Sequence, residues 1–173
     1  MTDAEEKTKY VKVEGADVFF YCDVTVESVL ELCMTIKKVE NDRHNPIYIH
    51  INSNGGDLHA GLGCLDFIKS LNPHIVTIVE GMCASAATFI FLGGDERRVL
   101  PNSYILIHQL GTDFWGKYDD LKDEMRQCEK LMKHMKNIYL KETTIPEEKL
   151  NKLMKRDLYL SYRKCVRYCI CKE

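Results

Sequence analysis

The chain has 173 residues, of which 45% are hydrophobic and 29% are charged. Its 24 lysines and arginines against 26 aspartates and glutamates give a formal net charge of −2. This balance argues against nucleic acid as a partner, because neutralising phosphates needs an excess of basic residues. No run of about 18 apolar residues occurs, so we expect no membrane span. The charged start of the chain does not fit a secretory signal peptide, and the length predicts one domain.

Eight cysteines are the unusual feature of the composition. They are scattered through apolar runs, at Cys22, Cys33, Cys64, Cys83, Cys128, Cys165, Cys169 and Cys171. No CxxC pair occurs, so we expect no metal site, and disulfide-stapled secreted domains are usually shorter and denser in cysteine. We interpret the cysteines as reduced, mostly buried thiols. We therefore expect a cytoplasmic protein, with an organelle matrix as the alternative.

The first half of the chain alternates short β-rich runs with segments of helical period. The pattern predicts strands over 18–21, 47–51 and 75–79, and helices over 25–39, 58–71 and from about residue 84. Thr25 is the expected N-cap of the first helix. Gly81 is expected to end the third strand, because glycine interrupts a strand pattern.

In the second half, the pattern predicts strands at 99–100 and 104–107 and a long helix over 118–141. Thr144–Glu147 is typical of a capping box that opens one more short helix. One side of the long helix carries an apolar stripe: Leu121, Met125, Cys128, Met132, Met135 and Tyr139. We interpret this stripe as a packing or subunit face rather than a cofactor site. Strands separated by crossover helices pair in parallel, so the predicted fold class is α/β.

Two segments at predicted strand ends are candidates for chemistry. Asn52–Asp57 contains the glycine pair Gly55-Gly56, which either lets backbone N–H groups approach a ligand or forms an ordinary tight turn. Ser85 lies among very small residues after a strand, near the start of a helix. That placement presents a hydroxyl beside N–H groups that favour a developing oxyanion. The alternative is that the small residues only permit close packing of helix on sheet.

His108 also follows a predicted strand, so its imidazole and the Ser85 hydroxyl can face one cleft. A lone histidine is more often a solvated or hydrogen-bonded residue than a catalytic base. We interpret the others in that way: His44, His50, His59, His74 and His134.

Four motifs occur in order: Asn52–Gly56, Gly81–Ser85, Leu100–Ser103 and Ile107–Gln109. Together they strongly resemble the ClpP family, the proteolytic subunits of Clp proteases, which are serine peptidases of the ClpP/crotonase superfamily. The resemblance runs from about residue 19 to residue 161. It implies an α/β, ClpP/crotonase-like fold of stacked β-β-α units with a protruding handle helix (about 110–142). The peptidase domain would span 18–173, after a polar N-terminal segment, 1–17, that has no clear counterpart in the family.

The resemblance also implies roles for single residues. Ser85 would be the nucleophile, His108 the general base and Asp157, in the segment Arg156–Ser161, the carboxylate that orients the base. The backbone N–H groups of Gly55 and Ala86 would form the oxyanion hole. The segments expected to flank an extended substrate are Gly56, Asp57 and Leu58 on one side and Leu110, Gly111 and Thr112 on the other.

The expected function is that of a serine endopeptidase that cleaves unfolded polypeptides and peptides inside a ring-shaped oligomer, without a metal or cofactor. By resemblance the oligomer would be two stacked heptameric rings, served by an ATPase of the Clp family. One alternative is a weakly active or inactive ring subunit with a structural role, although such subunits typically lose a triad residue. The other is a crotonase-like acyl-CoA enzyme, which generally uses carboxylates instead of a Ser-His pair.

Overall fold

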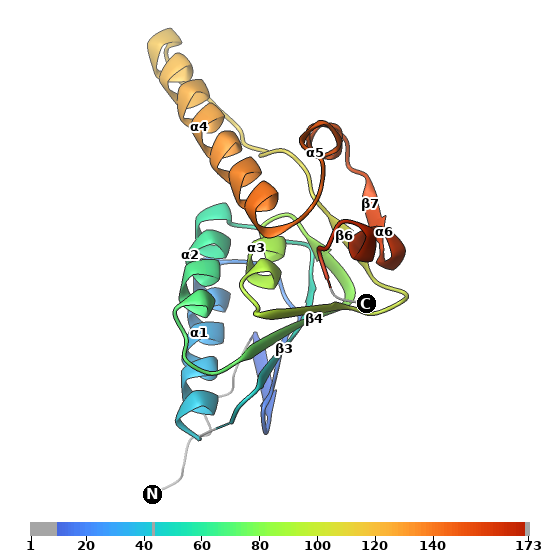
Figure 1. Ribbon diagram of the computed structural model, residues 1–173. Helices are drawn as coiled ribbons and strands as arrows, with labels where there is room; N and C mark the ends of the chain where they lie inside the picture. The colour runs from blue at the N-terminus through green and yellow to red at the C-terminus, as the bar shows by residue number, and fades with distance from the viewer. Residues whose placement is uncertain (1–9, 43, 172–173) are drawn as a thin grey trace, which may run out of the picture.

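The computed structural model describes residues 10–42 and 44–171 and confirms the α/β class (Figure 1). The strands are β1 (Val11–Glu14), β2 (Asp17–Phe20), β3 (Ile47–Ser53), β4 (Ile75–Ala84), β5 (Glu96–Val99), β6 (Tyr104–Leu106) and β7 (Tyr159–Ser161). The helices are α1 (Val26–Asn41), α2 (Leu58–Lys69), α3 (Ala87–Leu92), α4 (Tyr118–Glu142), α5 (Glu147–Met154) and α6 (Tyr162–Arg167).

The strands form one sheet in the order β1-β2-β3-β4-β6-β7, with β5 also paired to β4. The pairs β2–β3, β3–β4, β4–β5 and β4–β6 are parallel, whereas β1–β2 and β6–β7 are antiparallel. The long strand β4 pairs with β5 along its first half and with β6 along its second half. This arrangement brings the carboxyl ends of β4 and β6 to the same edge of the sheet.

Helices α1, α2 and α3 lie on one side of β3 and β4 (Figure 1). The predicted N-cap of α1 is confirmed: Thr25 Oγ1 accepts a hydrogen bond from the Ser28 N–H, and Ser28 Oγ accepts one from the Thr25 N–H. Such caps satisfy N–H groups that have no partner within the helix. The helix buries an apolar face that includes Leu32 and Ile36, both fully buried, in the core.

The prediction that Gly81 ends the third strand is wrong, because β4 continues to Ala84. Gly81 has φ +97°, and side chains of neighbouring segments satisfy the backbone around it. The Gly81 N–H donates to Ser103 Oγ at 2.8 Å, and the Met82 N–H donates to Asn52 Oδ1 at 3.2 Å. The next helix accordingly begins at Ala87 rather than near residue 84.

The capping box predicted at Thr144 is also wrong. Helix α5 begins at Glu147 after the N-cap Pro146, and no side chain caps it. The Thr144 N–H instead donates to the Tyr168 carbonyl at 2.8 Å, so Thr144 belongs to a contact with the last residues of the described chain.

Strand β1 was not predicted. It lies in the segment 1–17, which we expected to be polar, and residues 1–9 of that segment lie outside the described residues.

Helix α4 projects from the rest of the molecule (Figure 1), as expected of a handle. Its last turns pack on the body through Met135 and Tyr139, which are buried. The Tyr139 hydroxyl lies 2.6 Å from Thr88 Oγ1 on α3. Toward its first turns, Leu121 and Met125 are exposed. Among the described residues, no helix combines the length and the apolar composition that crossing a bilayer requires.

Candidate active site

Ser85 occupies the turn between β4 and α3 with φ +53°, a left-handed conformation that costs energy for any residue with a Cβ. Hydrogen bonds fix the serine turn on both sides. The Ser85 N–H donates to the Leu106 carbonyl of β6 at 3.0 Å, and the Ser85 carbonyl accepts from the Thr88 N–H at 3.0 Å and from Thr88 Oγ1 at 2.6 Å. These bonds to β6 and α3 keep the serine in a conformation that it would not adopt by itself.

The glycine loop after β3 lies directly against this turn. Gly55 has φ +94°, and a Cβ built on it would lie 2.5 Å from the Ala84 oxygen and 2.6 Å from Ser85 Cβ. A Cβ on Gly61 of α2 would similarly lie 2.6 Å from the Ala86 oxygen. Only residues without a side chain fit this close to the serine turn. This is a packing requirement, and the functional interpretation of the glycine pair stays a prediction.

Two N–H groups of the glycine loop, those of Gly55 and Gly56, are candidate donors for the expected oxyanion hole. The Gly55 N–H donates to Ser53 Oγ at 3.1 Å, so it is already engaged. In the part of the chain that the structure describes, the N–H groups of Ala86 and Gly56 make no hydrogen bond. Gly56 was expected to bind substrate, and its free N–H also makes it a candidate for the oxyanion donor that acts together with Ala86.

His108 and Ser85 follow two strands that are paired in parallel. β6 runs parallel to β4, with Ala84 paired to Leu106, so the residues that follow both strands lie at one edge. Asp157 precedes β7, which pairs antiparallel with β6. Its Oδ1 lies 4.0 Å from His108 Nδ1, and the side chains of His108 and Asp157 are 28% and 78% exposed.

The structure places the His108 and Asp157 side chains near each other but does not join them by a hydrogen bond. A separation of 4.0 Å exceeds a hydrogen bond, and no hydrogen bond joins the Ser85 and His108 side chains among the described residues. Catalytic hydrogen bonds are often long in a free enzyme and shorten when substrate binds. His108 Nδ1 is the ring nitrogen nearer to Asp157.

Of the expected substrate segments, 110–112 has no regular secondary structure. The Leu110 N–H donates to Met132 Sδ at 3.1 Å, which ties the segment to α4, while Gly111 and Thr112 are exposed. Across the site, Asp57 Oδ1 accepts a hydrogen bond from the Ala60 N–H at 2.7 Å and caps α2. The Asp57 side chain therefore has a structural role, and the Asp57 N–H is donated to the Val24 carbonyl at 2.7 Å.

A second polar cluster lies outside the site, around His50. Its Nε2 is 2.8 Å from Asp17 Oδ1 and its Nδ1 is 2.8 Å from Glu80 Oε1, so the imidazole bridges the two carboxyl groups. Burial alone would raise the pKa of Glu80, but hydrogen bonds from Tyr21 and His50 outweigh burial and hold it below its ordinary value. Burial and the bond to Glu80 raise the pKa of Tyr21 to about 12. The cluster fastens β2, β3 and β4 to one another.

All eight cysteines are free thiols in the structure. Cys83 lies two residues before the serine, and complete burial raises its pKa well above the ordinary value. A buried, protonated thiol is a poor nucleophile, so it does not compete with Ser85. Within residues 10–42 and 44–171, no group of three or more His, Cys, Asp or Glu side chains is placed to hold a metal ion.

Comparisons with known proteins identify the fold and the family. The mutant ClpP1 of Listeria monocytogenes has a solved structure that superposes with a TM-score of 0.82 at 26% identity, covering 92% of this chain and 90% of that one. This match confirms the predicted ClpP-like fold. The ATP-dependent Clp protease proteolytic subunit of Deinococcus radiodurans is 32% identical over 157 residues, which is 88% of this chain and 77% of the relative.

The corresponding subunit of Mesostigma viride is 34% identical over 124 residues, which is 70% of this chain but only 54% of that protein. The chain thus spans between about half and three quarters of the length of these curated relatives. The family model for the Clp protease matches residues 5–173. Because the family model, the curated relatives and the fold all match, the chain belongs to the Clp protease family.

Proposed function

We propose that this protein is a serine endopeptidase that hydrolyses peptide bonds of unfolded proteins and peptides with Ser85, His108 and Asp157. The observation that carries the proposal is the serine turn: Ser85 is held at φ +53° between β6 and α3, with a glycine loop in contact and His108 at the neighbouring strand end. Strained backbone of this kind persists only where the surrounding structure imposes it, and it is concentrated at functional sites.

In the proposed reaction, Ser85 Oγ attacks the peptide carbonyl while His108 Nε2 takes the hydroxyl proton. His108 then gives that proton to the leaving amine, and water repeats the sequence on the acyl-enzyme. Asp157 accepts the Nδ1–H, fixes the tautomer and stabilises the imidazolium. The 4.0 Å separation has to shorten by about 1 Å for that hydrogen bond to form.

The developing oxyanion would lie between the Ala86 N–H and the glycine loop. Gly55 was expected to supply the second donor. Its N–H can bind the oxyanion only after its hydrogen bond to Ser53 Oγ, 3.1 Å long, has broken. The Gly56 N–H has no such bond to break. Both glycines therefore remain candidates, with Gly56 favoured by its unoccupied N–H.

The alternative is a catalytically weak ring subunit. One observation favours it: the Asp157 side chain is 78% exposed, so nothing in the single chain holds it against His108. All three residues of the triad are present, however, and a subunit with a purely structural role has no need of a strained serine turn. We therefore rank the active peptidase first.

Labelling with a fluorophosphonate, which phosphonylates activated serines, tests the peptidase. The purified protein is expected to be labelled, and Ser85→Ala is expected to abolish labelling. Ser70→Ala is a matched control, because Ser70 is an exposed serine at the end of α2 and lies outside the site. If assembled wild-type protein remains unlabelled, the weak-subunit alternative holds instead.

We further propose that the chain forms heptameric rings, two of which stack face to face through the handle, with an ATPase of the Clp family as partner, in the cytoplasm or an organelle matrix. The exposed apolar side chains of α4 support a subunit contact there. Native mass spectrometry is expected to give about 280 kDa, fourteen copies of a 20.1 kDa chain. A monomer that persists at high protein concentration would contradict the handle assignment.

A further inference from the structure

A cavity of about 420 Å³ lies between α4 and α5, beside the proposed active site. It is lined by Gln109, Met132, Lys133, Lys136, Asn151, Met154 and Lys155. Its volume is in the range of cavities that bind ligands. Two lining residues adjoin the proposed triad in the chain, because Gln109 follows His108 and Lys155 stands two residues before Asp157.

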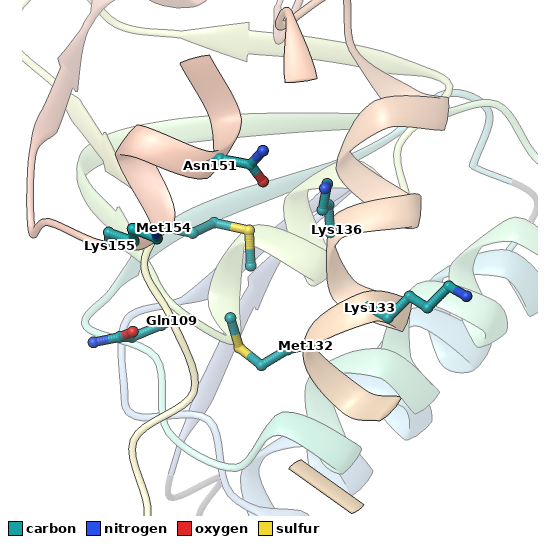
Figure 2. A pocket seen from close by; sticks show the side chains of 7 residues that line it. All are labelled: Gln109, Met132, Lys133, Lys136, Asn151, Met154 and Lys155. Atoms are coloured by element: carbon teal, nitrogen blue, oxygen red, sulfur yellow. The ribbon is translucent and has the colours of Figure 1, made fainter. Parts of the chain in front are cut away.

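The lining has an apolar middle and polar ends. Figure 2 shows the side chains of Met132 and Met154 extending into the space between α4 and α5. Gln109 and Lys155 lie toward one end, and Lys136 with Asn151 toward the other. The ammonium group of Lys133 points away from the methionines (Figure 2), so that residue lines the cavity with its stem only.

The charged side chains of this lining are all basic. It includes three lysines and no carboxylate, although the chain as a whole is slightly acidic. Lys136 Nζ is already 2.5 Å from Glu147 Oε1, a carboxylate that is largely exposed. Lys155 is exposed and makes no ion pair among the described residues. An anion entering the cavity therefore finds one unpaired ammonium group and one that is partly neutralised.

The cavity is also connected to the expected path of the substrate. The Leu110 N–H donates to Met132 Sδ at 3.1 Å, which holds the segment 110–112 against the cavity wall. A polypeptide paired with that segment would place alternate side chains toward the sheet edge and toward α4. A side chain on the α4 side would meet the two methionines first and the lysines beyond them.

We propose that this cavity receives an acidic side chain of the polypeptide substrate, glutamate in preference to aspartate. The methylene groups of glutamate would pack against Met132 and Met154, and its carboxylate would face Lys155, with Lys136 as the second cation. Cleavage would then favour bonds close to a glutamate. This inference rests on the proposed peptidase function and names the substrate class that its site selects.

The test compares fluorogenic peptides that differ by a single Glu or Gln, placed in turn at each position beside the cleaved bond. For wild-type protein, kcat/KM is expected to be about tenfold higher with Glu than with Gln at one of these positions. The ratio should fall as salt is added, because exposed charges are screened. Using the ratio removes any effect that a variant has on both peptides alike.

Lys155→Glu is expected to bring this ratio to one or below, and Lys136→Glu to lower it less, because Glu147 already pairs with Lys136. Lys164→Glu is the matched control: Lys164 is an exposed lysine on α6, outside the cavity, and its reversal should leave the ratio unchanged. Thermal unfolding and native mass establish that each variant is folded and assembled.

The outcomes separate the two proposals. If wild-type protein hydrolyses both peptides of every pair equally, the cavity does not select acidic side chains, while the peptidase function stands. A preference for Glu that survives both lysine reversals likewise overturns the assignment of this cavity. If the protein hydrolyses no peptide and takes no fluorophosphonate label, the peptidase function fails, and this inference fails with it.

Discussion

Replacing Asp157 by asparagine is expected to lower kcat for peptide hydrolysis by about 10⁴-fold, the effect that loss of tautomer control has in serine proteases. A carboxylate accepts the His108 Nδ1–H and so leaves Nε2 unprotonated for the serine. An amide can present its NH₂ group to the imidazole and favour the opposite tautomer, which has no free electron pair toward Ser85. Steady-state kinetics with a fluorogenic peptide measures the loss.

Asp66→Asn is the matched control for this experiment, because Asp66 is an exposed aspartate on α2 that lies outside the proposed site. It is expected to leave kcat close to the wild-type value. Asp157 is highly exposed in the single chain. A fall in kcat of less than tenfold in Asp157→Asn would mean that its carboxylate does not orient His108. Another group would then orient His108, and the triad assignment would be wrong at that position.

Placing alanine at Gly55 is expected to lower kcat at least about 100-fold, the usual effect of moving a reacting group by 1 Å. The added Cβ would lie 2.5 Å from the Ala84 oxygen and 2.6 Å from Ser85 Cβ, distances that require the loop or the serine turn to shift. Both atoms belong to the segment that presents the nucleophile. The rate of fluorophosphonate labelling and kcat should therefore fall together.

Gly15→Ala separates this clash from the cost of the backbone conformation. Gly15 also has a positive φ, +58°, but a Cβ on it meets nothing within 4 Å. Both variants incur the left-handed penalty of about 1–2 kcal/mol, which thermal unfolding measures, and only Gly55→Ala disturbs the serine. Equal activity in the two variants would mean that the glycine loop relaxes without moving the serine.

The elements with strong local signals could be predicted from the sequence. Helix α1 begins where Thr25 caps it, and β3 follows the alternation after Pro46. The errors arise where residues distant in the chain determine the local structure. The backbone at Gly81 stays in the strand because Ser103 and Asn52 supply its hydrogen bonds, and β1 forms by pairing with β2.

The residues of the candidate site likewise divide into those with a local sequence signal and those without one. Ser85 and His108 could be singled out as candidates because each follows a recognisable strand, and parallel strands end at one edge. Asp157 had no such signal, since it precedes a short antiparallel strand, and only the family resemblance pointed to it. The lysine-rich cavity joins residue 109 to segments 132–136 and 151–155, a combination that no local pattern contains.

The projecting helix α4 has a thermodynamic consequence. Leu121 and Met125 are 37% and 54% exposed, so the first turns of the helix bury little apolar surface against their own chain. An isolated helix of this kind is only marginally stable in water, and any partner that covers it adds stability by mass action. If α4 is the subunit contact, as proposed, its helical order should decline on dilution before the sheet unfolds, and the shape of each subunit would then depend on the concentration of the others.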